Sequence, residues 1–218
     1  MRVSSTYPER EQSKAEEIAN SISHGIGLGL AIAGTPFLIL YAARHENAEF
    51  LVATGVFCAT GIFLYLASAI YHALPSGATK QNFRIIEQSA IFLLIAGTYT
   101  PFTLGVLHGT LGWTLFGVIW TLAVAGVALK TVYKASHPNL FTALYLLMGW
   151  FIVIAIIPLL ERIPTAGFIW LLAGGLSYTF GVVFFVLDSR LKYAHLIWHL
   201  FVIAGTVCHY FAILNYAA

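Results

Sequence analysis

The last apolar segment of the chain reads YAHLIWHLFVIAGTVCHYFAILNY, from Tyr193 to Tyr216. It is long enough to cross a bilayer, because a helix needs ~20 residues to span the hydrocarbon. Two histidines, His195 and His199, stand four residues apart near its start. On a helix this spacing places both imidazoles on one face, where they can bind one divalent ion. The alternative is a pair of interfacial histidines in contact with headgroup water.

The composition sets the class of protein. Hydrophobic residues make up 59% of the chain and charged residues only 9%, whereas soluble domains are roughly 25% charged. The sequence therefore predicts an all-α integral membrane protein. The net charge of +2 is too small to suggest nucleic acid as a partner, and the basic residues do not form a run, so we expect no nucleic acid partner. Cys58 and Cys208 both fall in apolar segments, which predicts free buried thiols.

Seven apolar stretches are long enough to span a membrane, which predicts a seven-helix bundle. They cover residues 21–43, 50–72, 85–107, 111–130, 139–160, 165–187 and 195–216. Residues 1–20 form a short N-terminal segment, and residues 21–216 form the membrane domain. Pro36, Pro101 and Pro158 fall inside spans and predict kinks.

The basic residues predict the orientation. Of the eleven, only Arg44 and Arg162 fall in loops on one side. The other nine lie on the opposite side, and they are Arg2, Arg10, Lys14, Lys80, Arg84, Lys130, Lys134, Arg190 and Lys192. Because cytoplasmic loops are enriched in Lys and Arg, we expect a cytoplasmic N-terminus and an external C-terminus. The location expected for such a chain is the bacterial inner membrane.

With this topology, polar residues of three spans gather at the cytoplasmic end. Ser68 and His72 lie on one face near the end of the second span, and Glu87 lies near the start of the third. His195 and His199 begin the seventh span at the same end. Polar groups within a membrane are rare and usually mark a site. Three imidazoles, a hydroxyl and a carboxylate are therefore expected in one layer.

This set of side chains suits a catalytic zinc ion. Three neutral imidazoles can hold zinc and leave its fourth position to water, whose pKa falls to about 7 on the metal. Glu87 is the candidate to take the proton from that water, and Ser68 to steady an oxyanion. The alternatives are a bond from Ser68 to its own helix backbone and an interfacial Glu87 paired with Arg84.

The first span carries a further polar face. Glu17, Asn20 and His24 follow one another at helical spacing, with Ser23 adjacent. We expect them to support the metal ligands or the helix structurally, with His24 as an alternative fourth ligand or acid. His209 lies ~21 Å beyond His195 by helix rise, which excludes it from the same metal. The remaining histidines, His45, His108 and His137, fall in loops.

Four blocks of the sequence resemble the signature blocks of the bacterial hemolysin III family. This family groups with the seven-helix adiponectin and progestin receptors. The blocks occur in the same order as in the family and span nearly the whole chain. They are Glu17–His24, Ser68–His72, Ile95–Phe102 and His195–His199.

The resemblance implies a zinc ion held by His72, His195 and His199, with Ser68 at the family's serine position. It also implies metal-dependent hydrolysis in the membrane, because the wider group includes alkaline ceramidases. One departure concerns the acid: Glu87-Gln88 stands where the family usually has Asp, followed in many bacterial members by His. The charge is retained on a longer side chain.

Three functions are compatible with these features. The first is a zinc-dependent hydrolase that cleaves an amide or ester in a lipid-like, ceramide-like substrate, with membrane lipids as surroundings. The second is a sensor of membrane state in which zinc joins the helices without catalysis. The third is a hemolysin-like pore, which requires a polar track through the full depth of the membrane.

Overall fold

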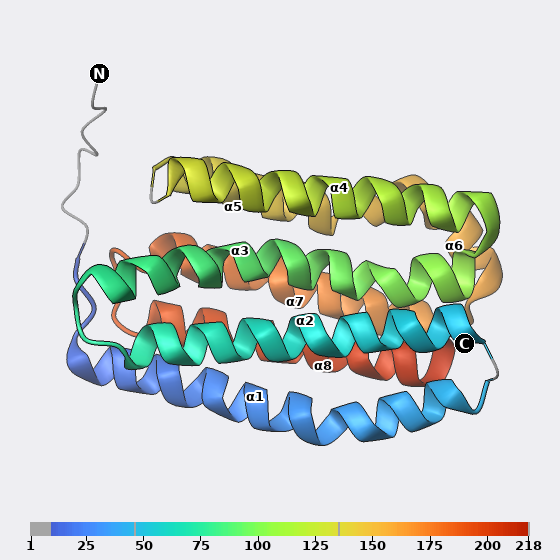
Figure 1. Ribbon diagram of the computed structural model, residues 1–218, viewed down its shortest axis with the longest axis horizontal. Helices are drawn as coiled ribbons and strands as arrows, with labels where there is room; N and C mark the ends of the chain where they lie inside the picture. Colours follow the sequence, from blue (N-terminus) through green and yellow to red (C-terminus); the bar gives the residue numbers. More distant parts are fainter. Residues whose placement is uncertain (1–9, 46, 135, 218) are drawn as a thin grey trace.

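The computed structural model describes residues 10–45, 47–134 and 136–217. Within these residues, seven helical segments are long and apolar enough to cross a membrane. They run up and down along one long axis (Figure 1). The prediction of an all-α, seven-span bundle is therefore confirmed. Arg2, used above for the orientation, lies outside the described residues.

The helices are named in chain order. They are α1 (Lys14–Ala43), α2 (Ala48–Ala73), α3 (Ala78–Pro101), α4 (Gly109–Tyr133), α5 (Pro138–Gly149), α6 (Ile156–Arg162), α7 (Thr165–Leu187) and α8 (Ala194–Tyr216). A π-helix, η1 (Phe102–Leu107), follows α3, and a 3-10 helix, η2 (Phe151–Ala155), follows α5.

The first helix begins at Lys14, seven residues before the predicted span. Its start is fixed by a capping box, in which the Ser13 hydroxyl accepts from the backbone of Glu16 and the Glu16 carboxylate accepts from the backbone of Ser13. Such a box satisfies backbone N–H groups that the first turn leaves unpaired. As a consequence, the polar residues from Glu17 to His24 all lie on one helix.

Neighbouring helices form a ring. Helix α1 packs against α2 and α8, α3 packs between α2 and α4, α7 packs against α8, and α5 contacts α3, α4 and α7. The start of α1, the α2–α3 turn and the α7–α8 turn lie at one end, and the C-terminus lies at the other (Figure 1). The polar ends of α1, α2, α3 and α8 therefore meet at the same end of the bundle.

Two spans change helical form near proline. Proline lacks an N–H group and its ring clashes with the carbonyl four residues earlier. The third span passes into η1 after Pro101, and the fifth breaks into η2 just before Pro158. The Tyr99 hydroxyl hydrogen-bonds to the backbone where the helix of the fifth span is interrupted. It accepts from Ile152 N at 2.8 Å and donates to Gly149 O at 2.7 Å. Helix α1 continues through Pro36.

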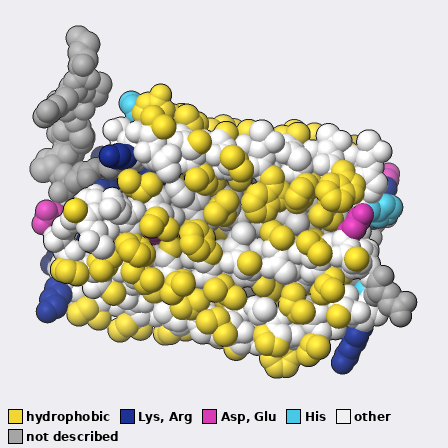
Figure 2. Space-filling view, in the orientation of Figure 1, with side chains coloured by type: hydrophobic (Ala, Val, Ile, Leu, Met, Phe, Trp, Pro, Cys, Tyr) yellow, Lys and Arg dark blue, Asp and Glu magenta, His cyan; other side chains and the backbone are white. Residues whose placement is uncertain are grey.

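The long sides of the bundle expose apolar side chains. Phe37, Val132 and Ile154 are each at least 70% exposed. Charged side chains lie near the two ends in the space-filling view, whereas hydrophobic side chains cover the flank (Figure 2). Water disfavours such a surface, so the flank of this bundle is suited to contact with membrane lipids.

Candidate metal centre

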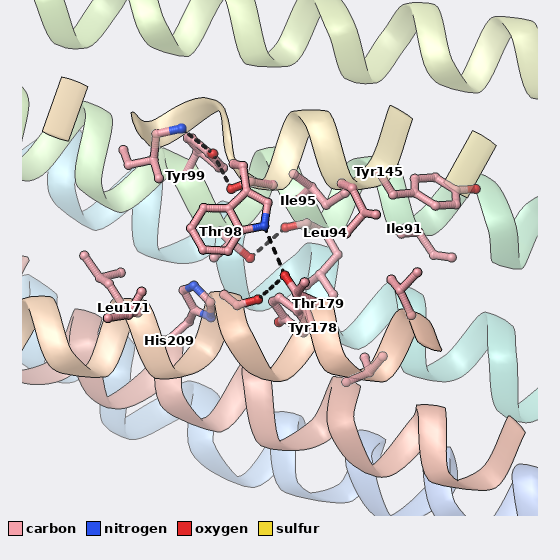
Figure 3. Close-up of a pocket in the computed structure, with 18 of the residues that line it drawn as sticks. Ile91, Leu94, Ile95, Thr98, Tyr99, Tyr145, Leu171, Tyr178, Thr179 and His209 are labelled. Carbon is pink, nitrogen blue, oxygen red and sulfur yellow. Dashed lines mark hydrogen bonds between the residues drawn. The ribbon is translucent and has the colours of Figure 1, made fainter. Parts of the chain in front are cut away.

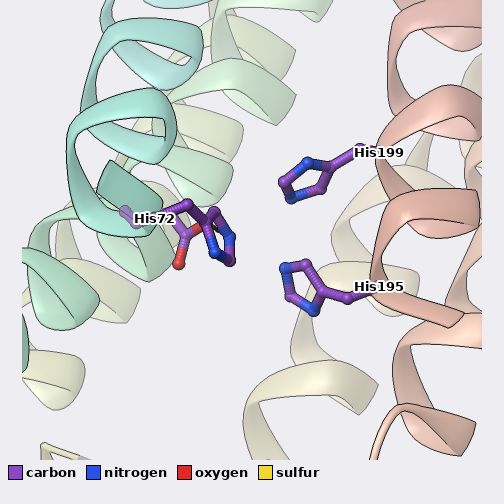
Figure 4. A group of neighbouring side chains, drawn as sticks. His72, His195 and His199 are labelled. Carbon is purple, nitrogen blue, oxygen red and sulfur yellow. Dashed lines mark ion pairs between the residues drawn. The ribbon is translucent and has the colours of Figure 1, made fainter. Parts of the chain in front are cut away.

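Four buried side chains from three helices converge at the end of the bundle where α8 begins. They are His72 on α2, Glu87 on α3, and His195 and His199 on α8. One ligand atom from each lies within 4.8 Å of the others. Figure 4 shows the two rings of α8 facing the ring of His72. The structure thus brings together the three histidines and the acid that the sequence singled out.

The inward nitrogen atoms of the three rings have no hydrogen-bond donor or acceptor among the described residues. The Nε2 atoms of His72, His195 and His199 are buried, and none has a hydrogen bond within the described residues. Buried polar atoms are normally hydrogen-bonded, so three unpartnered atoms in one place require an explanation. Three imidazole nitrogens beside a carboxylate are a donor set that fits a divalent first-row metal such as zinc.

The outward nitrogen of His72 is held by helix α1. Its Nδ1 lies 2.7 Å from a carboxylate oxygen of Glu17, and the other oxygen of Glu17 lies 2.9 Å from the ammonium of Lys80. An ionised carboxylate only accepts hydrogen bonds, so Nδ1 carries the proton. In the neutral form of the ring, the Nε2 atom therefore presents a lone pair to the centre.

The outward nitrogen of His195 is held by the loop before α8. Its Nδ1 lies 3.1 Å from Asp188 Oδ2, which also accepts from the Gln12 side chain at 2.8 Å. Burial raises the pKa of Asp188, but the hydrogen bond with His195 is among the contacts that hold it below its usual range. Sequence reasoning missed this partner. The available signal was that Asp188 is the only aspartate of the chain, seven residues before His195.

The outward nitrogen of His199 is also held by α1. Its Nδ1 lies 2.9 Å from Ser23 Oγ and 3.2 Å from the Asn20 carbonyl oxygen. The Ser23 hydroxyl donates its proton to the same Asn20 carbonyl at 2.8 Å, so it can only accept from His199. In their neutral form, all three rings therefore share one tautomer, with the proton outside and the lone pair inside.

The acid and the hydroxyl contact each other. Ser68 Oγ donates to Glu87 Oε1 at 2.7 Å, and the same oxygen lies 3.5 Å from His72 Nε2. Ser68 is fully buried and Glu87 only 8% exposed. The single proton of the serine is thus directed at the acid, in place of the helix backbone considered above. This arrangement favours a role for Ser68 in positioning Glu87.

His24 lies beside the ligand group without joining it. Its ring stacks on His199 with centroids 3.5 Å apart and planes 10° apart, and meets Tyr65 edge-on. Both ring nitrogens are buried without a hydrogen bond in the described part of the chain. The ring also lines the cavity described next. This places His24 next to whatever the cavity binds.

A cavity of about 200 Å³ extends from the ligand group into the bundle. Most of its lining comes from α3, α5, α7 and α8 and from the break η2, and α1, α2, η1 and α6 contribute one or two residues each, with His24 from α1. Glu87 and His24 are the parts of the lining next to the ligand histidines, and His209 lines it ~15 Å further along α8 than His199. Most of the lining between them is apolar (Figure 3). Such a lining does not favour a water-filled pore.

Seven apolar spans around a buried cluster of three histidines and one carboxylate define a polytopic membrane protein with a candidate metal centre. Sequence comparison then places the chain in a family. The sequence model of the family described as Haemolysin-III related matches residues 12–210, and the chain belongs to this family.

Relatives match over nearly the full length. Hemolysin-3 of Bacillus cereus is 44% identical over 201 residues, which cover 92% of this chain and 91% of the relative. The hemolysin-3 homolog of Bacillus subtilis (strain 168) is 42% identical, covering 92% and 94%. The human monocyte to macrophage differentiation factor is 28% identical over 212 residues, covering 92% and 84%. The resemblance stated from the sequence is therefore confirmed.

Proposed function

We propose that this chain is a zinc-dependent hydrolase that cleaves an amide or ester bond in a lipid-like substrate within the cell membrane. The observation that carries the proposal is the convergence of three inward lone pairs and one acid at the end of an apolar cavity. With the N-terminus in the cytoplasm, as the basic residues predict, the reaction takes place at the cytoplasmic side.

In this proposal His72, His195 and His199 hold the ion. When bound, zinc lowers the pKa of a coordinated water toward ~7 and polarises a carbonyl oxygen. The chain's contribution is to fix the three rings. Each outward nitrogen donates to a partner, Glu17, Asp188 or Ser23, so each inward nitrogen is ready to coordinate without changing its tautomer.

Glu87 is the proposed proton carrier. Its carboxylate can take a proton from the attacking water and return it to the leaving amine or alcohol. The hydrogen bond from Ser68 holds one carboxylate oxygen in place near His72. A glutamate keeps the negative charge that the family usually supplies with aspartate, so the chemistry does not require the shorter side chain.

The cavity supplies the place for the substrate. Its volume of about 200 Å³ and its apolar lining suit part of an acyl chain. Glu87 and His24 lie at the end where the polar head of such a lipid meets the metal ligands. If the acyl chain is held in the cavity, the bond to be cleaved lies next to the carboxylate of Glu87.

The test is turnover by the purified full-length protein. Ceramide-like amides and phospholipid esters are incubated with it, and fatty-acid release is measured by mass spectrometry. We expect release that a chelator abolishes and added zinc restores. Glu87→Gln is expected to lower kcat at least 100-fold, whereas Glu49→Gln at the exposed start of α2 leaves it unchanged. Metal-independent release, or none on any lipid, contradicts the proposal.

A second function is favoured by one observation. Glu87 itself belongs to the group of four possible ligands, and a carboxylate in the fourth position closes a zinc site, as in structural sites. Zinc would then join α2, α3 and α8 in a sensor of membrane state without breaking a bond. In that case Ser68→Ala leaves cellular function intact. Loss of function in this variant, with the metal still bound, excludes the sensor.

A further inference from the structure

His209 lines the cavity away from the candidate metal ligands, and the proposed hydrolysis assigns it no task. It is on α8, ten residues after His199, which corresponds to ~15 Å along the helix. Its ring is 8% exposed and lines the cavity with Tyr178 and Thr179 (Figure 3). A buried imidazole at this depth in a membrane protein is a candidate for binding.

The orientation of the His209 ring is fixed from three sides. Its Nδ1 lies 2.7 Å from the Gly205 carbonyl oxygen, which can only accept, so Nδ1 carries a proton. Tyr178 stacks on the ring with centroids 5.4 Å apart and planes 11° apart. A Cβ atom at Gly174 would lie 2.4 Å from His209 Cε1. The ring therefore fits in this position because residue 174 is a glycine, which has no side chain.

In the uncharged ring, Nε2 is left as a hydrogen-bond acceptor. No described residue donates to it, although it belongs to a ring that lines the cavity. The neighbouring hydroxyls are already used. Tyr178 contacts Thr206 Oγ1 at 3.0 Å, and Thr206 donates to a backbone carbonyl, so the tyrosine is the donor of that pair. Thr179 donates to a backbone carbonyl and accepts from the Trp150 indole.

We propose that His209 is a specificity site for a hydroxyl group carried by the chain of a lipid, ~15 Å from the end that meets the metal ligands. A neutral hydroxyl suits this acceptor, because burying a charged donor among apolar side chains is costly. This inference rests on the proposed function in one respect, which is that the polar head of the lipid lies at Glu87. The ligand class is a long acyl chain with a mid-chain hydroxyl.

The test compares two probes, stearic acid and a hydroxystearic acid whose hydroxyl is near the middle of the chain. Their affinities for the purified full-length protein in detergent are measured by calorimetry. We expect the hydroxylated acid to bind about tenfold more tightly, as one added hydrogen bond allows. His209→Phe should abolish the preference and leave stearic acid binding unchanged. His209→Gln, which keeps an acceptor oxygen, should retain part of it.

A second variant leaves His209 in the sequence. Gly174→Ala should displace the ring and abolish the preference, whereas Gly29→Ala, whose Cβ would meet nothing within 4 Å, should keep it. Equal binding of the two acids to the native protein, no binding of either, or a preference that persists in His209→Phe overturns the inference. Because binding is measured without turnover, a preference that persists in a protein without hydrolysis supports this site and contradicts only the proposed reaction.

Discussion

The Nδ1 atom of His199 on α8 lies 2.9 Å from the hydroxyl of Ser23 on α1, at the point where the first and last helices meet. Because Ser23 donates its own proton to Asn20, it fixes the imidazole with its lone pair inward. His72 and His195 are fixed in the same way by Glu17 and Asp188. Metal affinity is therefore expected to depend on residues that do not touch the ion.

Removing a charge outside the ligand group should weaken metal binding. Glu17→Gln and Asp188→Asn keep the size of each side chain but reduce its strength as an acceptor for the ligand histidine. We expect each variant to bind zinc 10- to 100-fold more weakly, the range for outer partners of metal ligands. Competition with a zinc-binding dye measures this, with Glu49→Gln as control. Native affinity in both variants contradicts the assigned tautomers.

Metal binding should stabilise the bundle. The ion would join three helices, and a ligand that binds only the folded state stabilises it by about 4 kcal/mol at a thousandfold excess over Kd. We expect thermal unfolding in detergent to shift upward when zinc is added to chelator-treated protein. His72→Ala should show no shift. A shift of the same size in this variant places the ion elsewhere.

Gly126 of α4 allows a close approach between helices. A Cβ atom at this position would lie 2.5 Å from the Phe92 ring of α3, and extra atoms in a packed core cost about 1–3 kcal/mol. Gly126→Ala should therefore lower the free energy of unfolding by this amount. Gly117→Ala on the same helix meets nothing within 4 Å and is the control. It should be neutral or slightly stabilising, since alanine favours helix.

Tyr99 should stabilise the break in the fifth span. Its hydroxyl accepts from Ile152 N and donates to the backbone of α5. Tyr99→Phe removes this partner from two part-buried backbone groups, which costs about 1 kcal/mol. Chemical unfolding in detergent measures the loss. Tyr133→Phe, on an exposed ring, is expected to change the stability little.

The spans and the members of the cluster of three histidines and one acid were predictable because each leaves a local signal. Long apolar runs identify membrane helices, and the spacing of His195 and His199 places both on one face. The basic residues gave a topology that placed His72 and Glu87 at the same end. The structure places these residues at the same end of the bundle. The side of the membrane that this end faces stays a prediction.

The remaining features depend on contacts between segments far apart in the chain. Asp188 precedes the last helix by six residues, and its position in the sequence does not fix the fold of the turn that brings it to His195. The contact between Ser68 and Glu87 depends on how α2 and α3 face each other. The cavity depends on the break before Pro158 and on the order in which the helices pack around it. The apolar periodicity of the sequence predicts neither of these features.

The most direct measurement is the metal content of the purified protein and of His72→Ala, His195→Ala and His199→Ala, by mass spectrometry of the metals. We expect close to one zinc per native chain and almost none in any of the three variants, with Glu49→Gln at the native level. A native chain without metal, or a variant that keeps its full complement while folded, would contradict the claim that these three rings bind one ion.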